Sequence, residues 1–405
     1  MKRRDFVGNV AFGGLVGAAA VGSASGQEPA SSKSAIATDR PDSLMTTPMA
    51  LMAPGEQCVT AIWGVSELCK GRLEWEDADG SKGTAETDPF GMVPQGTSVI
   101  RVHLSGLQPS REYRVRSVTT SASQGKTEVG PWKGFRTLNS AASETRFVVW
   151  NDTHVQNETI AKLDEVTPAA DFLVWNGDTC NDWTKNDLLI PTLLNPGNRD
   201  ITNKRPLMMI CGNHDVRGAW AFQLPEMIAT PSGRPFYAFR SGPVAAICLH
   251  TGEDKPDNHP SFAGRVAFDS LRAEQAQWLQ EIITQPLFRD APYRIVFCHI
   301  PLRWTTERIP DYDNGGYDYF SHRSRQAWHD SLVQWKTQLV ISGHTHQHQW
   351  IPANDRFPYG QLTGGGPKMA QATWIEAVAN AESLAIETHQ VGGGQSQVIR
   401  FDPIT

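Results

Sequence analysis

The sequence predicts an α/β domain preceded by a small all-β sandwich, and three observations support this assignment. Between about residues 45 and 138, short apolar runs alternate with period two and are separated by turn residues. From residue 146 onward the apolar runs become continuous and alternate with helical patterns, as the buried strands of an α/β domain do. The chain has 405 residues, 40% of them hydrophobic and 20% charged, which is enough to bury the cores of two or three domains.

Residues 1–26 resemble a twin-arginine export signal of bacteria. Arg3 and Arg4 stand in a basic start, which is followed by a weakly apolar stretch to about Val21 and by small residues at 23–25. We expect cleavage of this segment and a periplasmic or secreted mature protein; an uncleaved membrane anchor is the alternative. Residues 27–44, rich in Ser, Ala, Pro and Asp, are expected to form a linker. No later stretch is apolar enough for a transmembrane segment, which needs about 20 residues.

The first domain, residues 45–138, is expected to be a sandwich of short strands. Its candidate strands are 58–63, 70–75, 98–104 and 112–118. The stretch from Leu104 to Tyr113 resembles a fibronectin type III domain, in which a Leu-x-Pro turn precedes a strand that opens with Tyr. This resemblance implies that the Tyr113 hydroxyl pins the corner and that residues 135–137 belong to the closing strand. The sandwich could bind a partner or a polymer, or serve only as a packed structural part, and we favour the second role.

Six continuous apolar runs in the second domain are predicted to be buried strands. They are residues 146–150, 172–175, 207–211, 244–249, 295–297 and 339–341, and residues 271–283 carry a helical pattern. Five of these runs lead into polar motifs, which are 151–154 (Asn-Asp-Thr-His), 176–181 (Asn-Gly-Asp-Thr-Cys-Asn), 212–215 (Gly-Asn-His-Asp), 299–301 (His-Ile-Pro) and 342–346 (Ser-Gly-His-Thr-His). Because α/β domains place their sites beyond the carboxyl ends of strands, we expect these motifs to meet. Five of the twelve His residues fall in them, which argues against unrelated loops.

The order Asp-x-His, Gly-Asp-x-x-Asn, Gly-Asn-His-Asp, His and Gly-His-x-His resembles the calcineurin-like metallophosphoesterase family. The resemblance covers roughly residues 146–370, and we expect the catalytic domain to occupy residues 146–405. It implies a four-layer α/β/β/α sandwich. A β-sandwich ahead of such a domain resembles the layout of purple acid phosphatases and their bacterial relatives.

The same resemblance implies a site with two metal ions, Mn, Fe or Zn, for which nitrogen and oxygen donors are suitable ligands. The residues implied as ligands are Asp152, His154 and His346 for one ion, Asn213, His299 and His344 for the other, and Asp178 as the bridge between them. His214 would protonate the leaving oxygen or stabilise the charge of the transition state. The implied reaction is hydrolysis of phosphate monoesters or diesters by in-line attack of a metal-bridging hydroxide. Glycines 177, 212 and 343 are expected to let the backbone turn tightly beside the ligands.

Two positions depart from the pattern of purple acid phosphatases. Asn181 stands where they have a charge-transfer tyrosine, and His154 stands where they lack a histidine. We therefore expect no purple Fe(III) chromophore. In protein Ser/Thr phosphatases an Asp at the position of Asn181 orients the catalytic His. Here Asn181 could orient His214 only as a neutral group, and Asp215 and Asp182 are the other candidates.

Six cysteines are too few for a disulfide scaffold. We expect Cys211, Cys248 and Cys298 to be buried packing residues. Cys180, inside the second motif, is either a thiol near the metals or a bonding partner of Cys211. Cys58 and Cys69 are the candidate disulfide of an oxidising compartment.

The aromatic-rich segment 303–325 is a candidate substrate wall or lid.

The net charge of −6 argues against a protein whose main role is to hold nucleic acid on a basic face. We therefore expect a small phosphate ester as the substrate. A nuclease or nucleotidase of the same fold and a non-catalytic metal-binding protein are the alternatives. The sequence carries no signal for the oligomeric state.

Overall fold

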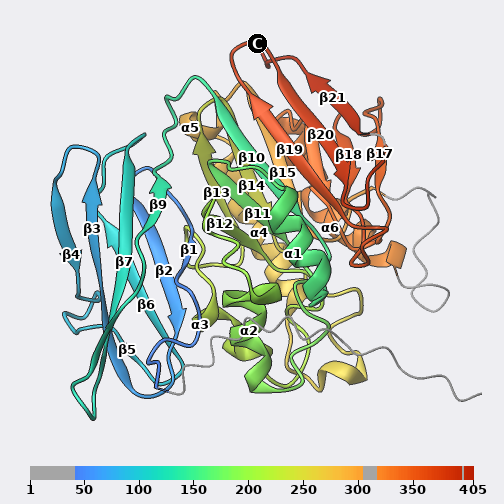
Figure 1. Cartoon of the computed structure of the whole chain (residues 1–405). Coiled ribbons are helices and arrows are strands. Elements are labelled where there is room, and N and C mark those ends of the chain that lie inside the picture. Colours follow the sequence, from blue (N-terminus) through green and yellow to red (C-terminus); the bar gives the residue numbers. More distant parts are fainter. Residues whose placement is uncertain (1–41, 304–316, 395) are drawn as a thin grey trace, which may run out of the picture. The chain divides into compact units, whose positions relative to one another are not determined.

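The computed structural model describes residues 42–303, 317–394 and 396–405 (Figure 1). The predicted export signal, residues 27–41 of the expected linker, and residues 304–316 of the expected substrate wall lie outside the described residues. Within them, two domains follow one another along the chain, and each is described below.

The sandwich is built from antiparallel strands, as its period-two pattern predicts. They are β1 (Ala50–Met52), β2 (Cys58–Gly64), β3 (Cys69–Asp77), β4 (Lys82–Ala85), β5 (Gln95–Gly96), β6 (Val99–Ser105), β7 (Glu112–Ser121), β8 (Thr127–Val129) and β9 (Lys133–Arg136). In β6 the side chains of Ile100, Val102 and Leu104 are buried and those between them are exposed. The Tyr113 hydroxyl accepts a hydrogen bond from the amide of Gln108 at 2.9 Å, which confirms the expected corner.

The second domain contains two mixed sheets. The first holds β10 (Thr145–Trp150), β11 (Phe172–Asn176), β12 (Leu207–Ile210), β19 (Thr373–Ala379), β20 (Leu384–Gln390) and β21 (Gln397–Phe401). The second holds β13 (Tyr237–Ser241), β14 (Val244–Leu249), β15 (Tyr293–Cys298), β16 (Leu339–Ser342), β17 (Gln349–Ile351) and β18 (Gly360–Thr363). The six strands predicted from apolar runs are all present. β10, β11 and β12 are parallel in one sheet, and β14, β15 and β16 are parallel in the other.

Helices cover the outer faces of the two sheets (Figure 1). They are α1 (Asn157–Val166), α2 (Leu189–Leu194), α3 (Leu224–Met227), α4 (Phe268–Ile282), α5 (Pro286–Arg289) and α6 (Tyr317–Gln334), with short 3-10 turns at η1 (Asn186–Leu188), η2 (Pro196–Asn198), η3 (Ala221–Gln223) and η4 (Pro260–Phe262). One core, containing Val148, joins the first sheet to α1 and α2, and another joins the second sheet to α4, α5 and α6. A third core, containing Phe147, lies between the sheets. Both faces of each central strand are therefore buried, which explains the continuous apolar runs and confirms the four-layer architecture.

Hydrogen bonds join the sandwich to the second domain. β1 pairs with β2 and, through Met52 and Leu207, with β12, so that nine strands form one continuous sheet. The ammonium group of Lys133 is buried and donates to Asp200 Oδ1 at 2.6 Å and to Thr202 Oγ1 at 2.9 Å. These contacts support the structural role that we favoured for the sandwich.

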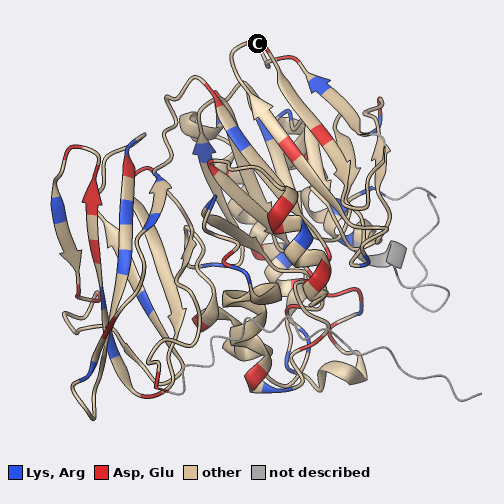
Figure 2. Cartoon of the chain, viewed as in Figure 1, with Lys and Arg blue, Asp and Glu red and all other residues tan. Residues whose placement is uncertain are grey.

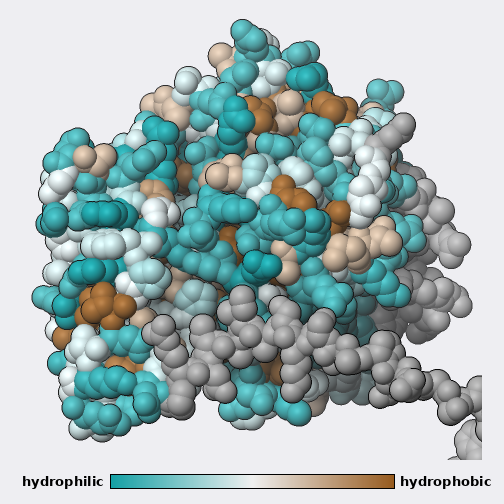
Figure 3. All heavy atoms as spheres, viewed as in Figure 1, coloured by the Kyte–Doolittle hydropathy of each residue, from teal (hydrophilic) through white to brown (hydrophobic). Residues whose placement is uncertain are grey.

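Figure 2 shows both signs of charge interspersed on the strands of the sandwich. The face of the described residues that Figure 3 shows is mostly polar, with small, separate hydrophobic patches. Of the helices in the described part of the chain, none combines the length and the apolar character needed to cross a bilayer.

The expected disulfide is not formed, because all six cysteines are free thiols. Cys58 is the first residue of β2, and Cys69 is the first residue of the next strand, β3. The two cysteines therefore start from opposite ends of the sandwich, separated by the length of β2, which is roughly 20 Å for seven residues. Cys180 and Cys211 are not bonded either. Cys211, Cys248 and Cys298 are buried, as predicted.

Replacing Lys133 by Met should weaken the junction between the domains. The change leaves Asp200 without its cation, and we expect a loss of about 2 kcal/mol, less than for a fully buried pair because the Asp200 side chain is 28% exposed. This corresponds to a fall in melting temperature of about 4 °C, measured by calorimetry. Lys82→Met is the control, since Lys82 is 71% exposed in its pair with Glu76 and should cost little. Equal melting temperatures for the two variants would contradict this account of the junction.

Candidate metal centre

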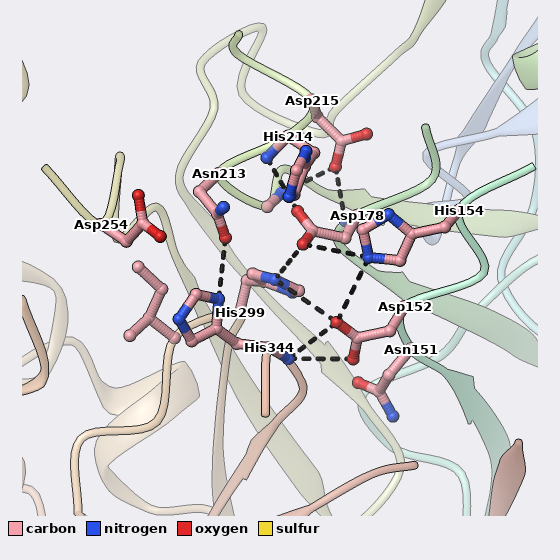
Figure 4. A network of polar contacts seen from close by, with 12 residues as sticks. Asn151, Asp152, His154, Asp178, Asn213, His214, Asp215, Asp254, His299 and His344 are labelled. Atoms are coloured by element: carbon pink, nitrogen blue, oxygen red, sulfur yellow. Dashed lines mark hydrogen bonds and ion pairs between the residues drawn. The ribbon is translucent and has the colours of Figure 1, made fainter. Parts of the chain in front are cut away.

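The structure brings together all the residues that the sequence predicted for the site (Figure 4). They lie at the carboxyl ends of β10, β11, β12, β15 and β16, which reach one edge of the two packed sheets. Three sets of side chains present possible ligand atoms within 4.8 Å of one another, and these are Asp152 with His154 and His346, Asp178 with His299 and His344, and His154 with Asp178 and His214. Motifs up to about 190 residues apart along the chain therefore meet at one place.

The loops that carry these side chains have an unusual backbone. Asp152, His154, Asp178, His344 and His346 all have positive φ, between 42° and 71°. Such a conformation costs a residue with a Cβ on the order of 1 kcal/mol or more. Hydrogen bonds between the loops stabilise it: the amide of His154 donates to the carbonyl of Asp178 at 3.0 Å, and the amide of His344 donates to both carboxylate oxygens of Asp152 at 2.9 Å. The strained backbone is concentrated where the candidate ligands converge.

The three motif glycines serve two different purposes. Gly177 has a φ of +84°, as expected for a tight turn. Gly212 and Gly343 do not have a positive φ; instead, their lack of a Cβ leaves space for a neighbouring carboxylate. A Cβ at Gly212 would lie 2.2 Å from Asp178 Oδ1, and one at Gly343 would lie 2.3 Å from Asp152 Oδ2. The expectation of tight turning at all three glycines was therefore wrong for these two, which permit close approach to a carboxylate.

The first candidate ligand group has nitrogen atoms that face one another. The Nδ1–H of His154 donates to Asn181 Oδ1 at 3.1 Å, which leaves the lone pair on Nε2. This Nε2 lies 3.1 Å from Nε2 of His346 and 3.4 Å from Asp178 Oδ2, and His346 Nε2 lies 3.5 Å from Asp152 Oδ1. Two adjacent ligands of one ion, each at about 2.1 Å and at right angles, would be about 3 Å apart. The arrangement fits a bound cation.

The second group is arranged in the same way around Asp178. The Nδ1–H of His299 donates to the carbonyl oxygen of Asn176 at 2.9 Å, and its Nε2 lies 3.1 Å from Asp178 Oδ2. Nδ1 of His344 lies 2.9 Å from Asn213 Oδ1. Asp178 is therefore shared by both groups, and its Oδ2 faces imidazole nitrogens from two different strand ends. This is the placement expected of a bridging carboxylate.

The pKa values of the side chains in this cluster favour the binding of a cation. Burial alone would raise the pKa of Asp178, but the charge of His299 and hydrogen bonds from His154 and His299 hold it well below its usual range. Burial and the neighbouring charge of His299 lower the pKa of His344 to about 3, and burial together with His154 lowers that of His346 to about 4. Asp178 is therefore ionised, and His344 and His346 are neutral, which is the state in which these groups bind metal. His299 differs, because its burial, which lowers the pKa, is outweighed by Asp178 and Asp152, which raise its pKa to about 10, so it must give up a proton before it can bind an ion.

His214 lies beside this cluster and is oriented by Asp182. Its Nδ1 is 2.9 Å from Asp182 Oδ1 and also donates to the backbone carbonyl of Asn181. The Asn181 side chain, which we considered for this role, holds His154 instead. Burial lowers the pKa of His214, but the hydrogen bond with Asp182 and the charge of Asp178 outweigh it and raise the pKa above its ordinary value. An anionic partner for His214 is thus present, one residue beyond the position expected from protein Ser/Thr phosphatases.

Asp215, another candidate partner of His214, has a different role. Its buried carboxylate accepts the amides of Asp178 and Gly212, each at 2.8 Å, and the amide and hydroxyl of Thr179 at 3.0 and 2.5 Å. It therefore locks the loop after β11 to the loop after β12. Because these donors saturate its oxygens, Asp215 is a scaffold residue and not a ligand.

Two features of the site were not found from the sequence. Asn176 donates to Asn151 Oδ1 at 3.0 Å and to the carbonyl of Ile341 at 3.2 Å, which ties the ends of three strands together. The loop after β14, the one predicted strand without a motif, brings Glu253 and Asp254 to the site (Figure 4 shows Asp254). An asparagine ending a strand and two acids in a loop are common surface patterns, so no sequence signal distinguished them.

Two cavities flank the cluster. One of about 380 Å³ is lined by residues that include Val155, Asn181 and Asp182, and one of about 410 Å³ by residues that include Arg217 and Arg265. Both contain residues that directly follow or contact candidate site residues, so each offers room for a small organic group next to the site.

Replacing Asp215 by Asn should destabilise the protein without removing a candidate ligand. The amide group would present N–H to donors that now point at a carboxylate, and we expect a loss of about 2–4 kcal/mol together with weaker metal retention. Chemical denaturation and metal quantification measure both. Thr179→Val is the matched control, since it removes only one of these donors and should cost about 1 kcal/mol. Wild-type stability in D215N would show that the carboxylate does not hold the loops.

Comparison with known proteins places this site in a family. Two relatives are named serine/threonine-protein phosphatase CPPED1. The Homo sapiens protein is 28% identical over 151 residues, 37% of this chain and 44% of that protein, and the Mus musculus protein is 23% identical over 230 residues, 55% of this chain and 67% of that protein. The chain thus matches less than half the length of the human relative.

A solved structure, the purple acid phosphatase PPD1 from yellow lupin (Lupinus luteus) seeds, shares the fold with a TM-score of 0.65 at 13% identity, over 89% of this chain and 75% of that one. Residues 145–348 match the family model described as calcineurin-like phosphoesterase, and this segment contains every candidate ligand and His214. The chain belongs to the calcineurin-like phosphoesterase family.

Proposed function

We propose that this protein is an exported, dinuclear metal-dependent hydrolase of phosphate esters. The observation that carries the proposal is the position of Asp178, whose Oδ2 lies 3.1 Å from His299 and 3.4 Å from His154, between two groups of nitrogen and oxygen donors. Membership in the calcineurin-like phosphoesterase family and the phosphatase names of the relatives support it.

In this proposal the ligands fall into two sets that share one carboxylate. Asp152, His154 and His346 would hold one ion, Asn213, His299 and His344 the other, and Asp178 both. When bound, the ions, Mn, Fe or Zn, would supply Lewis acidity toward the phosphoryl oxygens and would lower the pKa of a bound water. His214, held by Asp182, gives a proton to the leaving oxygen.

The substrate that we propose is a small phosphate monoester or diester. The flanking cavities have the size of a small organic group, and the net charge of −6 favours a small ester over a nucleic acid. In the view of Figure 2 both signs of charge are interspersed on the strands of the sandwich. We further propose that the N-terminal sandwich is a fibronectin type III-like domain that supports the catalytic domain. The Tyr113 corner and the continuous sheet through β1 support this reading.

Hydrolysis assays with metal quantification test the proposal. Purified protein loaded with Mn, Zn or Fe should hydrolyse p-nitrophenyl phosphate or bis(p-nitrophenyl) phosphate. Asp178→Asn should lose most of the bound metal and at least about 100-fold in rate, because the shared carboxylate serves both groups. Asp290→Asn is the control, a carboxylate that is 57% exposed and paired with Arg289. The proposal is wrong if no metal supports hydrolysis of either ester and D178N retains its metal.

Export through the twin-arginine route can be tested separately. We expect that replacing Arg3 and Arg4 together by Lys keeps the protein inside a bacterial host that has this route, whereas the wild-type chain reaches the periplasm or the medium. Fractionation and immunoblotting measure the distribution. A single Arg4→Lys change serves as the graded control. Equal export of the wild-type and double-substituted chains would contradict this part of the proposal.

A further inference from the structure

The loop after β14 reaches the site through Arg217. The Nε and Nη2 atoms of Arg217 donate to the two carboxylate oxygens of Glu253 at 2.7 and 2.6 Å, and Nη2 also donates to Asp254 at 3.1 Å. The Glu253 side chain is fully buried, and that of Arg217 is 17% exposed. A bidentate pair of this kind fixes the plane of the guanidinium group, not only its position.

The remaining edge of this guanidinium group faces the partner of His214. Nη1 of Arg217 lies 3.8 Å from Asp182 Oδ1, the same oxygen that lies 2.9 Å from His214 Nδ1. The backbone strengthens the link, since the amide of Arg217 donates to the carbonyl of His214 at 3.2 Å, and the amide of Trp183 donates to the carbonyl of Arg217 at 2.9 Å. The series of contacts from Glu253 to His214 is continuous.

We propose that Arg217, held by Glu253 and Asp254, is a positioning residue that fixes Asp182 and through it the ring of His214. The proposal rests on the function proposed above, in which His214 protonates the leaving group. The oxygen of the attacking hydroxide forms its bond to phosphorus as the bond from phosphorus to the leaving oxygen breaks. The electron pair of the broken bond goes to the leaving oxygen, and the proton on Nε2 of His214 transfers to it. The hydrogen bond between Nδ1 and Asp182 keeps Nε2 directed at the leaving oxygen during this transfer.

The charges around Arg217 argue against direct binding of the phosphoryl group. Its cationic edge is occupied by Glu253 and Asp254, and Lys255 is paired with Asp254. With Asp182 included, three carboxylates surround Arg217 and Lys255, and the protonated ring of His214 balances the third. No positive charge is left over to bind a phosphate ester, whereas a precisely held carboxylate beside His214 needs such an anchor.

The decisive experiment uses the metal-loaded full chain and two esters that differ in their leaving group. Expulsion of p-nitrophenol needs little proton assistance, whereas expulsion of an alkyl alcohol needs a general acid. Arg217→Met should lower kcat for an alkyl phosphate about tenfold or more and change kcat for p-nitrophenyl phosphate by less than about threefold. KM and metal content should stay within about twofold of wild type.

Matched variants separate the possible causes. Glu253→Gln keeps the shape and removes the charge that holds Arg217, so it should reproduce the R217M pattern more weakly, and Arg217→Lys should restore only part of the activity. Arg72→Met is the control, because Arg72 is paired with a carboxylate, Glu74 at 2.9 Å, on β3 of the sandwich and not on a loop of the site. In an H214N background, R217M should cause no further loss.

A second readout does not depend on activity. In protein labelled with ¹⁵N-histidine, the Nδ1–H resonance of His214, identified by its loss in H214N, should be protected from exchange with water and lose this protection in R217M. Any of four results would overturn the proposal: a raised KM with unchanged kcat, equal losses of kcat for both esters, an additive loss in the H214N background, or an unchanged His214 resonance. Failure of the wild-type chain to hydrolyse any ester would count against the proposed function alone, since the resonance still tests the positioning.

Discussion

The buried carboxylate of Asp178 is the constraint on which the rest of the site depends. A fully buried anion without partners costs several kcal/mol, so the fold must surround it with donors or cations. Here the amide of His214 donates to Oδ1, while Oδ2 faces ring nitrogens of His154 and His299. These contacts fix the relative positions of four strand ends. The two sheets must pack so that β10, β11, β12 and β15 end at the same level, and Asn176 also joins the ends of β11, β10 and β16 through the hydrogen bonds of its side-chain amide.

The sequence predicted the parts of this arrangement that are encoded locally. A strand buried on both faces is often continuously apolar, so the six strands with such runs could be recognised, and each motif follows its strand at once. β18, which pairs in parallel with β16, has the sequence Gly-Gln-Leu-Thr and could not be recognised in this way. The partner of His214 could not be chosen in this way. Asp182, Asp215 and Asn181 all lie near His214 or its motif partners in sequence. Only the folded loop after β11, which includes Asp178 with a φ of 52°, shows that the Asn181 side chain bonds His154 and that Asp182 bonds His214.

Long-range partners were missed for a related reason. Glu253 becomes functional only because β14 ends beside Arg217, and no periodicity or motif in the loop indicates this. The candidate disulfide was wrong for the same reason. Cys58 and Cys69 are close in sequence, but strand β2 separates them in space. The cysteines whose burial was predicted lie within apolar strand runs, where the local pattern is sufficient.

Three different means of neutralising acids divide the site into parts with separate roles. The oxygens of Asp215 are saturated by amide and hydroxyl donors, so it can hold loops but has no lone pair directed at an ion. Asp182 is neutralised on the side of Arg217, which leaves it free to orient an imidazole but keeps it away from the ligand cluster. Asp152 and Asp178 are surrounded mainly by imidazoles, which neutralise charge only when protonated. Without an ion this charge is supplied by His299, in which the effect of burial is outweighed by the two acids, so that its pKa rises to about 10. A bound cation would replace that proton, and this exchange, more than their proximity, marks Asp152 and Asp178 as the centre of the metal site.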